Sequence, residues 1–181
     1  MGRIRTVIDE AAKQFIEAQP MFFVASAPLD AHGHINLSPK GLASFRILGP
    51  STVAYLDLTG SGIETVAHLK ENGRLVLMFC AFSGPPTILR LHGRGRVIEP
   101  KNTEFETLAA HFPHYESVRS IIVVEINRVA NTCGFGVPLM KHEGDRSQLL
   151  AWAAKKGEAG LVEYRREKNM QSIDGLQGLT E

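Results

Sequence analysis

Short stretches rich in branched and aromatic residues recur along the first 130 residues, and each has the length of a β-strand. Six such strands are predicted, over residues 21–27, 35–38, 52–58, 74–82, 87–97 and 120–129. The early strands are joined by turns that are too short for a parallel crossover, so the pairing is expected to be antiparallel. Two glycines, Gly93 and Gly95, would let the fifth strand bend as barrel strands must.

Helical periodicity appears between and after these strands. Five helices are predicted, over residues 6–19, 63–72, 102–112, 146–156 and 158–168, and in the first three the apolar residues share one face. Pro20 is expected to end the first helix, Gly157 separates the last two, and residues 172–181 look like a loose tail. The pattern predicts a mainly β fold with helices (α+β), a six-stranded antiparallel barrel with peripheral helices. One domain over residues 1–181 is expected, with the barrel at roughly 20–130 and a helical extension at roughly 145–181.

The junction between residues 58 and 66 is the first place that suggests chemistry. Gly60 and Gly62 loosen the backbone before a predicted helix, so several amide donors would lie at the positive end of the helix dipole. This arrangement is typical of a phosphate site. Ser61 and Glu64 also have the spacing of a capping box, so the alternative is that they only cap the helix.

Composition excludes several classes of function. The formal net charge is +1 and only 7% of residues are aromatic, which argues against a nucleic-acid or membrane surface. No apolar run has the length of a membrane span or a signal peptide, so a cytoplasmic location is expected. Two cysteines make no disulfide framework, and the histidine spacings give no metal site. No nucleophile motif appears either, which suits a protein whose bound cofactor supplies the reactivity.

Two cations stand out beside this junction. Lys40 follows a strand end next to Ser38 and could hold a phosphate through a charge-assisted contact. The alternative is an ordinary solvated turn lysine. Arg90 lies among apolar residues of a strand and could point into a polar site, although a wet sheet face explains it as well.

Several stretches, taken in order, resemble the pyridoxamine 5'-phosphate oxidase-like FMN-binding split-barrel proteins. These stretches are MFFVASA (21–27), GHINLSPKG (33–41), YLDLTGSGIET (55–65), HLKENG (68–73), LMFC (77–80) and LRLHGRGRV (89–97). A flavoprotein branch of that family looks closest, because it also carries CGFGVP (133–138) and a tail similar to SIDGL (172–176). The resemblance runs from about residue 4 to the end of the chain.

The resemblance implies a six-stranded split barrel and a homodimer with FMN at the subunit interface. Its strand-end lysine matches Lys40, its phosphate loop falls on residues 59–65, and its strand arginine matches Arg90. The expected cofactor-binding residues are Asn36, Ser38, Lys40, Thr59, Ser61, Gly62, Glu64, Thr65 and Arg90. Asn36 and the 133–137 loop are expected near the flavin ring.

The function implied is an FMN-dependent oxidoreductase that transfers hydride through the flavin to or from an unidentified small molecule. The alternative is a flavin or tetrapyrrole binder, a carrier or sensor, that does no catalysis on the same barrel. The phosphate loop lacks the Ser-Arg-Lys of authentic vitamin B6 oxidases, so that activity is not expected. The sequence leaves open the substrate, the electron donor, the choice between FMN and a deazaflavin, and the role of Cys133.

Overall fold

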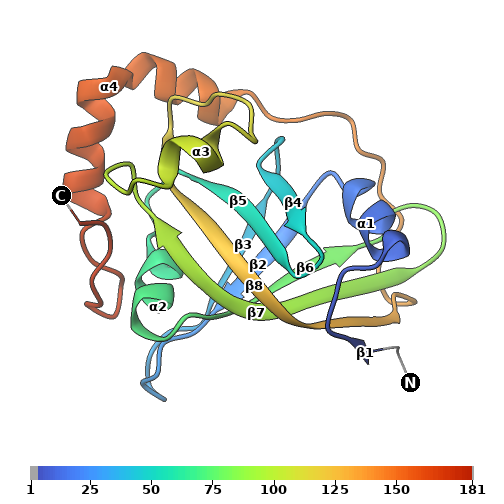
Figure 1. Cartoon of the computed structure of the whole chain (residues 1–181). Coiled ribbons are helices and arrows are strands. Elements are labelled where there is room, and N and C mark those ends of the chain that lie inside the picture. The colour runs from blue at the N-terminus through green and yellow to red at the C-terminus, as the bar shows by residue number, and fades with distance from the viewer. Residues whose placement is uncertain (1–3, 181) are drawn as a thin grey trace.

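The structure is a computed structural model that describes residues 4–180. Within that range one antiparallel sheet of eight strands is accompanied by four helices (Figure 1). The strands are β1 (Ile4–Arg5), β2 (Phe22–Ser26), β3 (Asn36–Lys40), β4 (Phe45–Gly49), β5 (Thr52–Leu58), β6 (Arg74–Cys80), β7 (Thr87–Ile98) and β8 (Val118–Cys133). The helices are α1 (Glu10–Glu17), α2 (Glu64–Asn72), α3 (Phe105–Ala109) and α4 (Gln148–Lys168).

The sheet curls into a barrel that is not closed. Its strand order is β3-β2-β6-β7-β8-β5-β4, with β1 paired to β8, so β3 and β4 are the two ends of the path. Phe45 of β4 nevertheless packs on Phe22 of β2 and Phe79 of β6, with ring centroids 5.1 and 5.2 Å apart. Strands far apart in the sheet order therefore meet across the interior, and the expected α+β split-barrel fold is confirmed.

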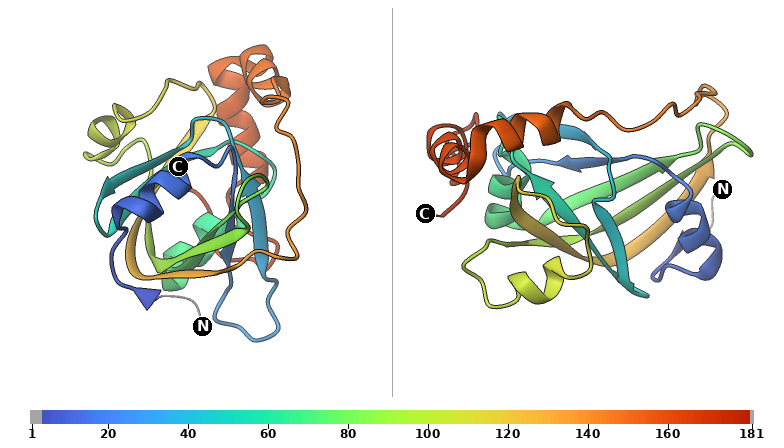
Figure 2. Two further views of the ribbon diagram at one scale, coloured as in Figure 1. Left: turned by 90° about the vertical axis from the view of Figure 1, so that its right-hand side faces the viewer. Right: turned by 90° about the horizontal axis from the view of Figure 1, so that it is seen from above.

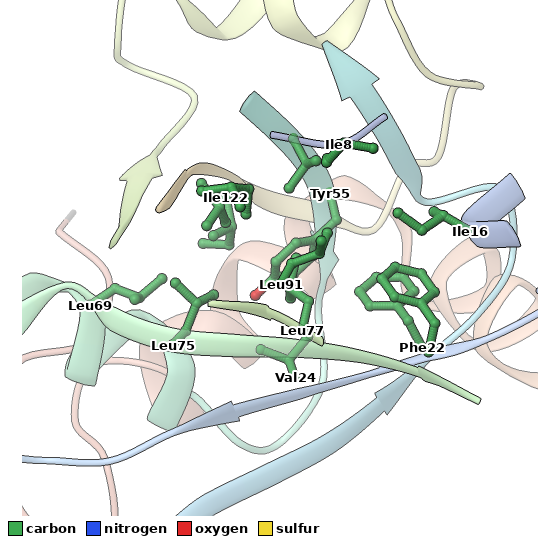
Figure 3. Close-up of a cluster of buried hydrophobic side chains, with 14 of the residues drawn as sticks. Ile8, Ile16, Phe22, Val24, Tyr55, Leu69, Leu75, Leu77, Leu91 and Ile122 are labelled. Atoms are coloured by element: carbon green, nitrogen blue, oxygen red, sulfur yellow. The ribbon is translucent and has the colours of Figure 1, made fainter. Parts of the chain in front are cut away.

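The barrel interior is filled with side chains, as Figure 3 shows for the cluster around Tyr55, Leu77 and Leu91. A second apolar cluster lies outside the barrel, where α3 covers Leu56 and Ile121. Strands β5 and β8 are thus buried on both faces, and this explains why their sequences run apolar without alternation. The strand bend lies at Gly93, where the β7–β8 register shifts and a Cβ atom would come 2.3 Å from the Glu125 carbonyl oxygen.

Three element boundaries differ from the sequence-based prediction. Residues 45–49 form strand β4 instead of a loop. Their apolar and polar residues alternate only weakly, but pairing with β5 provides hydrogen-bond partners for their backbone. Helix α1 starts at Glu10, four residues later than predicted, because Asp9 caps it by accepting a hydrogen bond from the Ala12 amide at 3.0 Å. Strand β8 begins two residues earlier than expected, at Val118, and this brings Arg119 into the sheet.

The prediction of a loose C-terminal tail is wrong. Helix α4 bends at Gly157, which has a left-handed φ of 64°, and its second half leads into a segment packed beside α2 (Figures 1 and 2). Leu179 is buried in the barrel core cluster, and its amide donates to the Asn169 carbonyl. The tail carries one anchoring apolar residue among polar ones, so its periodicity gave no sign of packing. No helix in the described range 4–180 is long and apolar enough to cross a membrane.

Candidate functional site

A buried carboxylate organises the polar end of the barrel. Asp57 lies on β5 with a side chain that is 1% exposed, and it accepts hydrogen bonds from Lys40 Nζ at 3.0 Å and Arg119 Nε at 2.7 Å. Ser120 Oγ donates to the same carboxylate at 3.3 Å. Burial alone would raise the pKa of Asp57, but the charges and hydrogen bonds of Lys40 and Arg119 outweigh it and lower the pKa to about 2. Asp57 is therefore ionised at neutral pH.

Two cations around one carboxylate leave a net positive charge, and both cations line a cavity of about 280 Å³. The cavity lies between the edge strand β3 and the loop that enters α2. Its lining residues are Asn36, Ser38, Pro39, Lys40, Leu58, Gly60, Gly62, Glu64, Thr65 and Arg119. The structure thus brings together six of the nine expected binding residues.

A hydrogen-bonded network fixes the β3 side of this cavity. The Asn36 amide donates to Thr65 Oγ1 at 2.8 Å and to Ser26 Oγ at 3.3 Å, and its carbonyl accepts from Ser38 Oγ at 2.9 Å. Behind it, Ser26 Oγ lies 2.9 Å from Nδ1 of the fully buried His68. Burial lowers the pKa of His68, so this ring is neutral at pH 7. The Asn36 amide therefore positions Thr65 and Ser26 as a donor, and the Asn36 carbonyl positions Ser38 as an acceptor.

The entrance to α2 has amide donors and no side-chain cap. Ile63 occupies the N-cap position without a side-chain hydrogen bond, and α2 begins at Glu64. The predicted capping box of Ser61 and Glu64 is therefore wrong: Ser61 is exposed, and Glu64 Oε1 instead accepts from the Ile173 amide at 3.4 Å. A helix N-terminus without an internal cap offers its amides and its positive dipole end to an anion.

Three expected binding residues do not line this cavity. Thr59 is fully buried, donates to the Ser117 carbonyl at 2.8 Å and accepts from Arg165 at 2.8 Å, so it supports the loop from behind. Ser61 points to solvent at the loop surface. Arg90 lies opposite Met78 on the outer face of the sheet and donates to Thr132 at 3.1 Å. The alternation of β7 sends Arg90 to the face opposite the buried Leu89 and Leu91.

Sequence reasoning missed Asp57 and Arg119, the pair at the centre of the site. Asp57 carried a readable signal, because an acid inside the apolar run Tyr55 to Leu58 needs a partner if that run is buried. Arg119 gave no comparable signal, since it lies just before a predicted strand. Among the described residues, no group of three or more histidine, cysteine, aspartate or glutamate side chains is placed to bind a metal.

Comparison with known proteins identifies the family. The family model for pyridoxamine 5'-phosphate oxidase matches residues 8–133, which include every residue of the cavity wall. The chain belongs to the pyridoxamine 5'-phosphate oxidase family. A relative in Aspergillus flavus, the pyridoxamine 5'-phosphate oxidase family protein ustO, is 41% identical over an alignment of 180 positions that covers 89% of this chain and 71% of that protein.

Solved structures show the same fold. The crystal structure of HupZ from Group A Streptococcus superposes with a TM-score of 0.55 at 21% identity and covers 70% of this chain and 94% of that one. Its H111A variant gives the same TM-score and covers 69% and 99%. At this identity the likeness supports the pyridoxamine 5'-phosphate oxidase-like barrel alone.

Replacing Asp57 with asparagine tests whether the buried ion pairs carry stability. We expect Asp57→Asn to lower the free energy of unfolding by about 3–5 kcal/mol at pH 7, because Lys40 and Arg119 lose their counter-charge in a buried place. Urea denaturation measures this, and Glu158→Gln, at an exposed position on α4, is the matched control with a change within about 0.5 kcal/mol.

The stability that ionised Asp57 contributes should depend on pH in a known direction. The folded pKa of Asp57 is lowered from 3.8 to about 2, so its contribution is present above about pH 4 and disappears as the pH falls toward 2. The stability difference between wild type and Asp57→Asn should shrink over that window. A difference that stays constant down to pH 2 would contradict the assignment.

Proposed function

We propose that the chain is an FMN-binding flavoprotein that acts as an oxidoreductase on a small molecule. The observation that carries this proposal is the cavity beside α2, where the cations Lys40 and Arg119 lie next to uncapped helix amides; Asp57 pairs with both cations, and Glu64 is the carboxylate of the cavity wall. Membership of the pyridoxamine 5'-phosphate oxidase family supports a flavin as the ligand.

The residues of the cavity fit the phosphate and ribityl chain of FMN. Lys40 Nζ, with its side chain 20% exposed, is the more accessible cation, and Arg119 sits deeper at 5%. The Thr65 hydroxyl accepts from the Asn36 amide, so its proton is free to be donated to a phosphate oxygen, whereas Ser38 would first have to release the Asn36 carbonyl. The carboxylate of Glu64 would repel a phosphate, so we assign it to the ribityl hydroxyls, which can donate to it.

Bound FMN would supply hydride chemistry at its ring, and this chain would supply position and charge. Asp57 orients Lys40 and Arg119 at the bottom of the cavity by accepting hydrogen bonds from both. Vitamin B6 oxidation itself is not proposed, since the 59–65 loop carries no cation.

We further propose that a second copy of the chain covers the outer face of the sheet. Pro39 lines the cavity and lies opposite Phe23 in the register, and the same face continues through Val76 and Met78. Leu37 on this face is 62% exposed. A homodimer would bury this side chain. Analytical sedimentation of the wild-type chain should give the mass of a dimer, and Leu37→Asp should give the mass of a monomer. A wild-type chain that sediments as a monomer would remove this part of the proposal.

Substituting the accessible cation tests the flavin site. Lys40→Met should raise the dissociation constant for FMN about tenfold or more, because one charge-assisted contact contributes about 1.5–3 kcal/mol. Quenching of flavin fluorescence measures it. Lys13→Met, at an exposed position of α1, is the control and should bind as wild type does. Equal affinities for all three proteins would remove Lys40 from the site.

Redox assays separate an enzyme from a carrier or sensor of flavin or tetrapyrrole. Purified protein should be yellow, and the released molecule should have the mass of FMN and not of a deazaflavin. Anaerobic reduction by NADH or NADPH, followed by reoxidation with candidate acceptors, should give turnover that depends on the acceptor. Bound flavin without turnover over a broad panel would favour the carrier. A colourless protein that ignores added FMN would contradict both. The cytoplasmic location remains a prediction.

A further inference from the structure

A second cavity lies behind the 59–65 loop, under the C-terminal segment that sequence analysis took for a loose tail. It measures about 430 Å³, which is within the usual range for small-molecule sites. The turn after β7, the second half of α4 and the tail supply its walls. The lining residues are Glu99, Pro100, Lys101, Arg119, Val162, Arg165, Arg166, Met170, Leu179 and Thr180.

The side chains that line this cavity include more positive than negative charges. Four cations and one carboxylate line it, and the carboxylate is already engaged. Glu99 pairs with Lys70 at 2.6 Å and accepts from the Thr180 amide and hydroxyl, both at 2.8 Å. Among residues 4–180, a ligand at this site would therefore meet four cations and a single lining carboxylate, Glu99, which is already paired.

Arg165 is the cation with the poorest compensation. Its guanidinium is half-buried and donates only to neutral oxygens, Thr59 Oγ1 at 2.8 Å and the Val118 carbonyl at 3.1 Å. Within residues 4–180 no carboxylate pairs with it. Burial and the charge of Arg119 lower the pKa of Arg165, which marks a cation in an unfavourable place. An anion bound beside Arg165 would offset that cost.

The neighbouring side chains define what kind of anion fits. Arg119 is neutralised by Asp57, whereas Arg166 pairs only with Glu163 at 3.2 Å on an exposed surface, where such pairs contribute little. Val162, Met170 and Leu179 give the cavity an apolar floor. A bare inorganic ion would leave this floor uncovered.

We propose that this cavity binds a small organic anion, a phosphate or carboxylate attached to an apolar body. The anionic group would lie against Arg165 and Arg166, and the body would cover Val162 and Met170. The site is separate from the flavin cavity, although Arg119 lines both, and its occupancy does not depend on the proposed flavin.

Phenyl phosphate is the probe, titrated into the full chain by isothermal calorimetry, with inorganic phosphate and phenol as its two halves. We expect phenyl phosphate to bind at least about tenfold more tightly than either half, because charge and apolar contact act together. Arg166→Gln should weaken its binding about fivefold and Arg165→Gln more strongly. Val162→Phe, at a position 46% exposed, should fill the cavity and abolish binding.

Two controls locate the binding. Lys155→Gln, on the exposed first half of α4, removes the same charge outside the cavity and should change nothing. Lys40→Met should also leave phenyl phosphate binding unchanged, which separates this site from the flavin cavity. Arg165→Gln could unfold the loop behind Thr59, so Arg166→Gln and Val162→Phe, both at exposed positions, decide the test. The proposal is overturned if phenyl phosphate does not bind, or if inorganic phosphate binds as tightly as phenyl phosphate does. It is also overturned if Lys40→Met is the one variant that reduces phenyl phosphate binding.

Discussion

The carboxylate of Asp57 joins three parts of the chain that are far apart in sequence. It fixes Lys40 from the edge strand β3 and Arg119 from the long strand β8, while it stands on β5 between them. A buried carboxylate is costly unless it is paired, and here two cations pair with it and keep it ionised. The cluster carries one excess positive charge, which Glu64 in the cavity wall balances, so the proposed anion would have to lie against Lys40 and the amides of α2 and away from Glu64.

The C-terminal segment acts on the same place from behind. Asn169 donates to the Gly60 carbonyl at 2.9 Å, Arg119 donates to it at 3.1 Å, and Arg165 holds Thr59. The loop that faces the proposed flavin cavity is therefore supported by three residues, two of which, Arg119 and Arg165, also line the second cavity. In this layout Thr59, expected as a flavin ligand, is buried behind the loop and does not line the proposed flavin cavity.

The sequence was informative where local chemistry decides the structure. Branched and aromatic runs located the six main strands, and the glycines at 60 and 62 located the phosphate-type loop. It failed where distant contacts decide. Strand β4 forms because β5 pairs with it, the tail packs because Leu179 finds the barrel core, and Arg119 matters because of a partner 62 residues away. Arg90 was placed on the correct strand, but only the observed register showed that it faces away from Lys40.

The central claim is that charge at the Asp57 cluster, through the phosphate, provides most of the flavin affinity. Comparing FMN with riboflavin, which has the same ring and ribityl chain without the phosphate, tests this most directly. The account predicts that riboflavin binds at least about a hundredfold more weakly at moderate salt, a loss near 2.7 kcal/mol, and that this ratio falls as the salt concentration rises. Equal affinities for FMN and riboflavin would contradict it.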